Sequence, residues 1–244
     1  MRRNALASAD FIATPQHLVL RAPTCYDARM PRGNSKRPVS KSEYLKSLCV
    51  LGGALELRSL PLCPELRLWL LHDGVDLNAR VPELLQSASA PYWAFCWGAG
   101  QALARYLLDH PELVRGRHVV DFGAGSGVAG IAALLAGAAS ATAVDIDSTA
   151  LRVAAYNAEE NGVELATALQ VPETWDVMLA SDVLYESNNE HWLAEAAASG
   201  RDVLLSDPLR HGTARVGLTP VAEYAVRTLP DVDYPIGRAV VHRL

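Results

Sequence analysis

The sequence has few cysteines and no long apolar run, and both shortages exclude classes of protein. Its four cysteines are widely spaced, without a CxxC pair or a histidine cluster at the spacing of metal ligands. We therefore expect reduced thiols and no metal site. The longest apolar stretches, such as residues 128–139, are too short and too rich in alanine and glycine to cross a bilayer. We expect no transmembrane helix and no membrane partner.

Positive charge is scarce outside the first 50 residues. That segment holds nine of the 22 Lys and Arg residues and three of the 27 Asp and Glu residues, so the remainder carries 13 basic and 24 acidic residues. An acidic body suits a cationic partner, such as a lysine-rich protein surface, better than a phosphate backbone. We expect a protein substrate and no nucleic acid. A solvated acidic surface without a steering role explains the same counts, because sequence does not place the charges on one face.

Residues 1–54 form a basic N-terminal extension, and residues 55–244 are long enough for one catalytic domain. Residues 1–46 are rich in arginine and poor in acids, as in an organelle transit peptide, whereas residues 31–41 have the composition of a linker. We interpret the segment as a loosely ordered extension of a cytoplasmic protein. The mitochondrial matrix is the alternative if it is a transit peptide.

Strand-like and helix-like segments alternate through most of the domain. We expect strands at residues 118–122, 141–146, 163–169, 176–181 and 202–206, with helices at 128–135, 148–161 and around 190–198. This alternation favours a mostly parallel sheet covered on both faces. Two further strand-like segments, at residues 221–229 and 237–244, predict a closing antiparallel pair.

The region before this alternation is expected to add a small helical layer. Residues 55–71 suggest a short strand, a proline-containing turn and a helix that begins near Pro64, because proline suits the first turn of a helix. Another helix is expected at residues 101–108. It follows a densely aromatic segment at residues 91–97, against which we expect something flat or apolar to pack.

The strand-like segments at the end of the chain distinguish between two α/β fold classes. Five parallel strands followed by a hairpin match the Rossmann-like, seven-stranded sheet of class I S-adenosylmethionine (SAM)-dependent methyltransferases, in which the last strand inserts antiparallel beside its neighbours. A dinucleotide-binding fold would need a fuller second half. Residues 170–175, between the third and fourth strands, are also too short for a full helix. We predict a compact, trimmed class I sheet.

The strongest local motif is an acid that leads from a strand into alternating glycines. Asp121 lies in the first expected parallel strand and is followed by Gly123, Gly125 and Gly127, after which a helix is expected. Glycines allow a sharp turn and close approach to a ligand, and the start of a helix presents amide donors. A polar ligand is therefore expected across this loop, with all three glycines as contacts.

The same glycines leave two cofactors open. Gly125, Gly127 and Gly130 also satisfy GxGxxG, the dinucleotide fingerprint, and Asp145 lies at a compatible distance for binding a ribose. Three features favour SAM over a nicotinamide cofactor. Asp121 is placed to receive a methionine amine directly or through water, the closing hairpin fits, and the second nucleotide-binding half is incomplete.

Asp145 lies near the end of the second parallel strand, where its carboxylate can accept hydrogen bonds from both ribose hydroxyls. Asp147 competes for this role. We expect Asp147 instead to cap the following helix, together with Ser148.

The candidates for substrate chemistry follow the fourth parallel strand. Asp182 and Tyr185, in the sequence SDVLY, fall where open α/β sheets bind ligands, beside the carboxyl ends of the strands. An alternative is that Asp182 caps the next helix and Tyr185 is a core aromatic. The chain lacks the Asn/Asp-Pro-Pro-aromatic motif typical of methyltransferases that act on nucleobase amines.

Together these motifs resemble the protein-lysine methyltransferases with a seven-stranded sheet, and among them the family that methylates the β subunit of electron transfer flavoprotein. The similarity covers about residue 55 to the C-terminus. Its most specific stretches are PELRL at residues 64–68 and PYWAFCWGAGQALARYLLDHPELVRG at residues 91–116. Residues 207–210 read Asp-Pro-Leu-Arg where Asp-Pro-Gly-Arg is expected, so Leu209 is a departure at a turn that borders the substrate.

The resemblance implies a SAM-dependent N-methyltransferase acting on a lysine of the electron transfer flavoprotein β subunit or a similar protein. It also implies that Trp97 lies against the cofactor, although an ordinary core aromatic remains open for this residue, and that Asp182 and Tyr185 frame the lysine channel. Asp182 would position the lysine and accept its proton. Methylation of a small molecule or a ribosomal protein, or SAM binding without catalysis, stays open.

Overall fold

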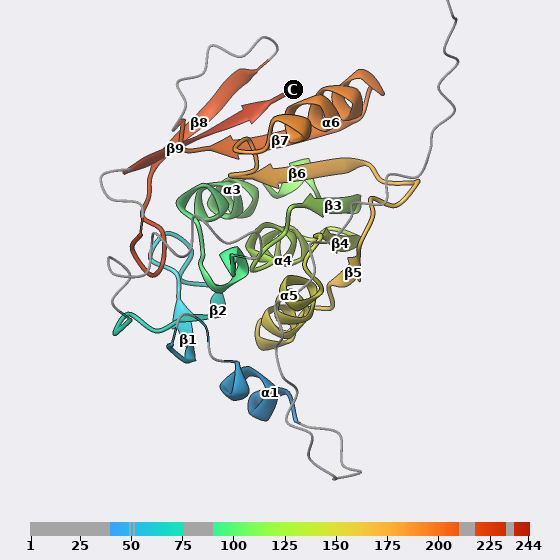
Figure 1. Ribbon diagram of the computed structural model, residues 1–244. Coiled ribbons are helices and arrows are strands. Elements are labelled where there is room, and N and C mark those ends of the chain that lie inside the picture. The colour runs from blue at the N-terminus through green and yellow to red at the C-terminus, as the bar shows by residue number, and fades with distance from the viewer. Residues whose placement is uncertain (1–39, 49, 51, 76–89, 210–217, 233–236) are drawn as a thin grey trace, which may run out of the picture.

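The computed structural model describes residues 40–48, 50, 52–75, 90–209, 218–232 and 237–244. Its centre is a mixed sheet of seven strands in the order β5-β4-β3-β6-β7-β9-β8 (Figure 1). Every strand predicted downstream of residue 117 is present. Their bounds are β3 His118–Phe122, β4 Ser140–Val144, β5 Ala166–Ala168, β6 Val177–Ser181, β7 Asp202–Asp207, β8 Thr219–Ala225 and β9 Arg238–Arg243.

The strand directions confirm the predicted topology. Strands β5, β4, β3, β6 and β7 run parallel, whereas β9 is antiparallel to both of its neighbours, β7 and β8. The last strand is therefore inserted between the two that precede it in sequence. The five parallel strands share one carboxyl edge, where loops from distant parts of the chain meet.

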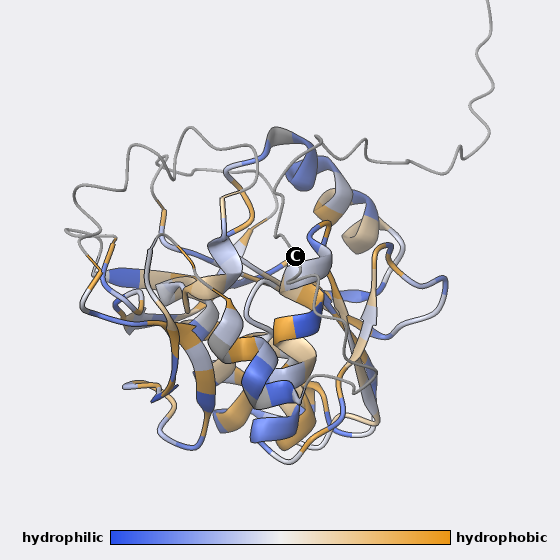
Figure 2. Cartoon of the chain, turned by 60° about the horizontal axis from the view of Figure 1, so that its bottom comes forward, coloured by the Kyte–Doolittle hydropathy of each residue, from blue (hydrophilic) through white to orange (hydrophobic). Residues whose placement is uncertain are grey.

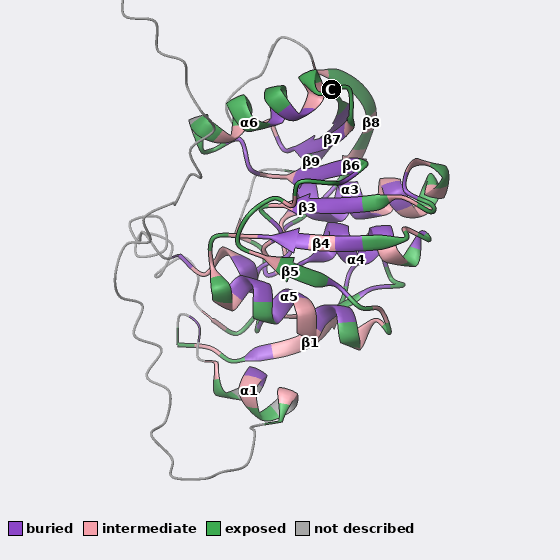
Figure 3. Cartoon of the chain, turned by 90° about the vertical axis from the view of Figure 1, so that its right-hand side faces the viewer, coloured by how far each residue is buried: buried purple, intermediate pink, exposed green. Residues whose placement is uncertain are grey.

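Helices cover the two faces of the sheet unequally. Helices α3 (Gly98–Asp109), α4 (Val128–Leu135) and α5 (Ser148–Glu160) lie on one face, and α6 (Ser187–Ala198) lies on the other (Figures 1 and 3). Some helices in Figure 2 carry hydrophilic residues beside hydrophobic ones, as expected for helices with one face on the core, whereas α4 is apolar throughout and mostly buried. Among the described residues, no helix is both long and apolar enough to cross a bilayer.

Alternate residues of each parallel strand supply two separate cores. Val119 packs in the cluster that contains residues of α3 and α4, whereas its neighbour Val120 packs in the cluster that contains Leu193 of α6. Leu204 and Leu205 of β7 divide in the same way. Burial on both faces explains why these strands are nearly continuous apolar runs in the sequence.

The helix predicted to begin near Pro64 is wrong. Residues Arg67–Leu71 form strand β2, which pairs antiparallel with β1 (Leu55–Ser59). Leu66, Leu68 and Leu70 are fully buried while the residues between them are exposed or half-buried. This spacing of two is the strand period, and pairing with β1 satisfies the backbone groups that a helix would have satisfied internally.

Part of the predicted extension packs on the domain. Helix α1 (Lys41–Ser47) begins with a capping box formed by Ser40 and Glu43, and its Leu45 is fully buried. The ring of Tyr44 lies 5.7 Å from that of Tyr156 in α5. Residues 1–39, to which most of the transit-peptide and linker predictions apply, lie outside the described residues, so the division at residue 54 stays a prediction.

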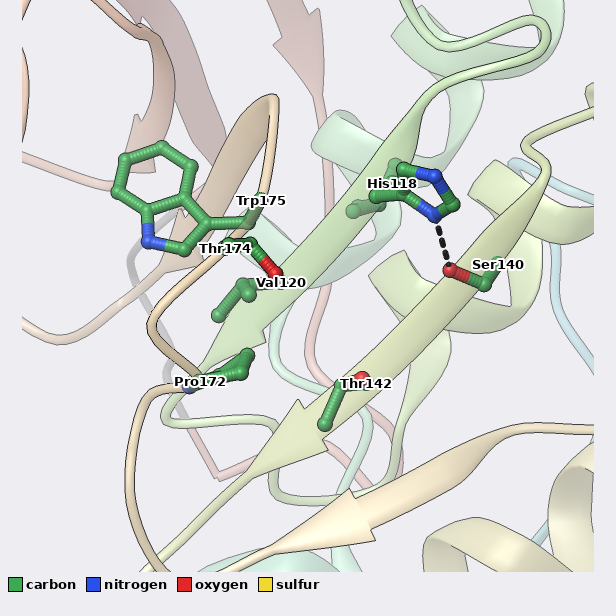
Figure 4. A pocket seen from close by; sticks show the side chains of 8 residues that line it. His118, Val120, Ser140, Thr142, Pro172, Thr174 and Trp175 are labelled. Carbon is green, nitrogen blue, oxygen red and sulfur yellow. Dashed lines mark hydrogen bonds between the residues drawn. The ribbon is translucent and has the colours of Figure 1, made fainter.

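A shallow hollow of about 240 Å³ lies near the amino ends of β3 and β4 (Figure 4). The connection of residues 170–175 contains no helix, as predicted, and part of it, including Pro172 and Trp175, lines the hollow. Polar groups also line it, and His118 Nδ1 lies 2.9 Å from Ser140 Oγ. A sheet face that packs under a helix is normally apolar. No described helix covers the sheet at this hollow, so its lining meets solvent and includes polar side chains.

Candidate functional site

The glycine loop connects β3 to α4 at the carboxyl edge of the sheet. Gly123, Gly125 and Gly127 all have left-handed backbone conformations, with φ of +67°, +51° and +82°. A Cβ atom at Gly127 would lie 2.9 Å from the Cβ of Ala154 in α5. Only glycine therefore fits both the backbone and the space at residue 127. The tight turn leaves the first amide groups of α4 directed at the space above the loop.

Asp121 lies beneath this loop and is almost completely buried, with 1% of its surface exposed. Its Oδ2 accepts a hydrogen bond of 2.8 Å from the backbone N–H of Gly130 in α4. Burial raises the pKa of Asp121 to about 7, and the nearby charge of Asp145 adds to the increase, while the bond from Gly130 opposes it. A cationic ligand group beside this carboxyl would favour its ionised form.

Asp145 connects the end of β4 to the glycine loop. Its Oδ2 accepts from the N–H of Gly125 at 2.9 Å, and its Oδ1 accepts from the N–H of Asp147 at 3.0 Å. Burial raises the pKa of Asp145, and these backbone bonds lower it in part. The side chain of Asp147 accepts from the N–H of Thr149 at 2.7 Å, which confirms its predicted role as the cap of α5.

Asp182 and Tyr185 follow β6 at the same edge. The alternative in which Asp182 caps α6 is wrong, because Glu186 holds the position before that helix and the N–H of Asp182 donates to the carbonyl of Ser206 in β7. This bond holds Asp182 in a left-handed conformation with φ of +55°. Tyr185 is not a core aromatic either, since 60% of its surface is exposed.

The tyrosine hydroxyl remains protonated at neutral pH. Partial burial raises the pKa of Tyr185 to about 12, and the negative charges of Asp145, Glu186 and Asp182 add to the increase, as does Tyr92. Asp145 and Asp182 follow the ends of β4 and β6, and Glu186 precedes α6, so charges from separate segments act on Tyr185. It can donate a hydrogen bond there, but it is a poor base.

An aromatic group closes the site from the side of α3. The ring of Tyr92, in the short helix η1 (Tyr92–Ala94), lies 5.9 Å from Tyr185 and 5.8 Å from Trp97. Trp97 Nε1 donates to the carbonyl of Tyr92 at 3.0 Å, and the Trp97 ring lies 5.6 Å from Phe95. A Cβ atom on Gly125 would lie 3.9 Å from the backbone of Trp93, so this segment covers the glycine loop.

The structure therefore brings all eight sequence-predicted residues to one edge of the sheet. Sequence reasoning missed Tyr92, although it identified the aromatic segment that contains it. It also missed Asn157, a fully buried polar residue in α5. An asparagine in the middle of a predicted helix was a usable signal, because asparagine is a poor helix former and is usually kept there for its hydrogen bonds.

Leu209 is a second strained residue at this edge. It has φ of +59°, and with Asp182 it completes the set of described non-glycine residues that have positive φ. Its N–H donates to Asp207 Oδ1 at 2.6 Å, and Asp207 is buried at the end of β7. A left-handed residue is what a glycine in the expected Asp-Pro-Gly-Arg turn would provide, so the leucine retains the turn under strain. Residue 210 lies outside the described residues.

The family model that matches this chain covers the glycine loop, Asp145, Asp182 and Tyr185. The family model of ribosomal protein L11 methyltransferase (PrmA) matches residues 101–187. An electron transfer flavoprotein beta subunit lysine methyltransferase from Xenopus laevis is 38% identical over 187 residues, covering 70% of this chain and 75% of the relative. The Homo sapiens protein of the same name is 38% identical over 160 residues, covering 61% of each chain.

A solved structure, that of a SAM-dependent methyltransferase-type protein of Streptococcus mutans, supports the fold. It matches with a TM-score of 0.52 and 11% identity, covering 78% of this chain and 55% of that one. At this identity the likeness bears on the architecture alone.

Proposed function

This chain belongs to the electron transfer flavoprotein beta subunit lysine methyltransferase family, and we propose that its acceptor is a lysine of that flavoprotein subunit. It is a SAM-dependent protein-lysine N-methyltransferase with the predicted class I fold. The choice between SAM and a nicotinamide cofactor, which the glycine spacing left open, is thereby decided for SAM. The flavoprotein itself is the proposed substrate because the matched relatives carry its name.

The chemistry of the loop fits SAM. The left-handed glycines leave a surface without side chains beside the start of α4, and the buried carboxyl of Asp121, whose pKa is raised, is matched to a cationic amino group. In this proposal Asp145 accepts hydrogen bonds from the ribose, and Trp97 presents an aromatic face to positive charge. When bound, SAM supplies a methyl group activated by a cationic sulfonium.

The protein must present the lysine as a neutral amine. Free lysine has a pKa near 10.4, so deprotonating it at pH 7 costs about 4 to 5 kcal/mol. In our proposal the carboxylate of Asp182 attracts the ammonium group, fixes its direction, and accepts the proton or passes it to water. Attraction by a carboxylate also raises the lysine pKa, so Asp182 acts mainly by alignment. The hydroxyl oxygen of Tyr185 accepts a hydrogen bond from the amine N–H, which orients the amine and leaves its lone pair free to attack.

The observation that carries the proposal is the placement of Asp182 and Tyr185 beside the glycine loop, with Tyr185 close to Asp145, Tyr92 and Glu186. The acids that act on Tyr185 suit the positive charge of an incoming lysine side chain. Asp182 has a left-handed backbone and donates its N–H to the neighbouring strand β7, an arrangement that is also typical of functional strain.

The test is methylation of purified electron transfer flavoprotein with tritiated SAM. We expect label on the β subunit, and we expect Asp182→Asn to lower kcat by about 100-fold or more while the dissociation constant for SAM changes by less than about threefold. Asp202→Asn, an acid at the opposite end of the neighbouring strand, is the matched control and should keep full activity. Absence of label on the flavoprotein despite SAM binding would refute the proposed acceptor.

A ribosomal protein is the second candidate acceptor. It is favoured by the match of residues 101–187 to the ribosomal protein L11 methyltransferase model. The same assay on purified ribosomes separates the two, because label should then appear on a ribosomal protein and not on the flavoprotein.

A further inference from the structure

One buried amide connects the β1–β2 hairpin to the glycine loop. Asn157 lies in α5 and has no exposed surface. Its Oδ1 accepts from the N–H of Trp69 in β2 at 2.7 Å, and its Nδ2 donates to the carbonyl of Ser126 at 2.9 Å. These partners are 88 and 31 residues away in sequence. The amide of Asn157 therefore uses its oxygen to bind the hairpin and its nitrogen to bind the glycine loop.

The bond to Ser126 acts on the buried base of the glycine loop. Ser126 lies between Gly125 and Gly127, whose left-handed backbones require glycine. The peptide unit is planar, so fixing the carbonyl of Ser126 also fixes the direction of the Gly127 N–H, which donates to the carbonyl of Ala124 at 2.8 Å and closes the turn. On the other side, Asp145 accepts from the N–H of Gly125. The loop is thus held from β4 by an acceptor and from α5 by a donor.

We propose that Asn157 is a positioning residue for SAM, which holds the glycine loop in its binding geometry and makes that geometry depend on the docked β1–β2 hairpin. The proposal rests on the assignment of SAM to this loop and does not depend on which protein is methylated. Asn157 acts through the backbone of the loop and does not itself touch the cofactor.

Asn161, which caps the C-terminus of α5 four residues after Asn157, offers a matched control. Its Oδ1 accepts from the N–H of Arg67 at 2.9 Å, and its Nδ2 donates to the carbonyl of Arg67 at 2.7 Å. Asn161 thus fastens the same hairpin to the same helix, but its hydrogen bonds go to the hairpin and to α5 and not to the glycine loop. A role in hairpin docking alone predicts the same effect for both asparagines.

The test compares the two asparagines in the full chain by calorimetric titration with S-adenosylhomocysteine and by thermal melting. We expect Asn157→Leu to raise the dissociation constant by about tenfold or more, and Asn161→Leu to change it by less than about threefold, although both lower Tm. Asn157→Asp keeps an acceptor for Trp69 and loses the donor to Ser126, so it should weaken binding as well. The Asn157→Asp variant keeps the test informative if Asn157→Leu does not fold.

Amide hydrogen exchange of residues 123–130 gives a second readout without ligand. Exchange there should become faster in both Asn157 variants and stay unchanged in Asn161→Leu, because of the two asparagines only Asn157 bonds to the loop. Equal effects of the Asn157 and Asn161 substitutions on ligand binding, or unchanged binding in the folded Asn157 variants, would overturn the proposal.

Discussion

The two ends of the parallel strands differ in how well their polar groups are compensated. At the carboxyl end, Asp121 and Asp145 are acids whose pKa values are raised by burial. Asp182 and Leu209 there have strained backbones, and Tyr185 exposes an aromatic ring. Each of these features costs free energy, as is common at functional sites.

At the amino end the charges are paired. Arg117 forms a 2.8 Å ion pair with Asp202, which also pairs with Arg243. Partial burial opposes ionisation of Asp202, but the hydrogen bonds and charges of the two arginines outweigh it and lower its pKa. Arg117 also donates to the carbonyls of Leu113 and Asp176 at 3.0 Å. These ion pairs are structural charges, in contrast to the buried acids at the other end of the same strands.

The largest expected difference between the ends is in cofactor binding. Asp145→Ala removes an acceptor for the ribose and releases the N–H of Gly125, so the dissociation constant for S-adenosylhomocysteine should rise by roughly 10- to 100-fold, from charged hydrogen bonds of about 1.5 to 3 kcal/mol. Asp202→Ala, at the amino end, should leave binding unchanged and lower stability by about 1 kcal/mol or less. Equal effects in calorimetric titrations of the two variants would remove the proposed distinction.

A smaller effect is expected of pH on the affinity for S-adenosylhomocysteine, through the carboxyl group of Asp121. The folded-state pKa of Asp121, about 7, exceeds its ordinary value of 3.8, so the folded apo protein binds the extra proton. Its contribution to stability is complete below pH 3.8 and is lost as pH rises through 7. A cationic ligand favours the ionised carboxyl, so affinity for S-adenosylhomocysteine should increase by up to about tenfold from pH 6 to pH 8.

Asp121→Asn should make this affinity independent of pH over the same interval, whereas Asp202→Asn should preserve the dependence. Calorimetric titrations with S-adenosylhomocysteine at pH 6, 7 and 8 measure this dependence in both variants. A pH profile that persists in Asp121→Asn would assign the proton to another group.

The smallest expected effect concerns the strained turn. Leu209→Gly removes a left-handed leucine, which costs about 1 to 2 kcal/mol, and adds chain entropy to the unfolded state of about 0.5 to 1 kcal/mol. The net result should be a gain of about 0.5 to 1 kcal/mol, measured by urea unfolding. Leu169→Gly serves as the control, because Leu169 is exposed and lacks positive φ, so this change should lower stability. A loss of stability in Leu209→Gly would show that the leucine side chain outweighs the strain.

Sequence reasoning succeeded where the required information is local. The glycine loop was predictable because Gly123, Gly125 and Gly127 adopt the positive φ angles that glycine favours. The cap at Asp147 was predictable because its partner, Thr149, is only two residues away. Strands buried on both faces were recognisable as short apolar runs. The position of Asp182 and Tyr185 followed from the rule that the carboxyl ends of parallel strands meet at one edge.

It failed where distant segments decide the outcome. Residues 67–71 are compatible with a helix or a strand, and pairing with β1 selects the strand. The sequence also left open that Asp182 caps a helix, and only the fold shows that Glu186 holds that position while the N–H of Asp182 donates to the carbonyl of Ser206. The two partners of Asn157 are not marked in the sequence at all.

The positions of the strands along the chain, the glycine loop and the placing of acids at strand ends follow from local backbone preference and hydrophobic periodicity, which a sequence carries directly. The folded chain decided which acids are compensated and which are strained. Burial and charge pairing depend on neighbours brought from other strands, and these set the raised pKa of Asp121 at one end of the sheet and the lowered pKa of Asp202 at the other.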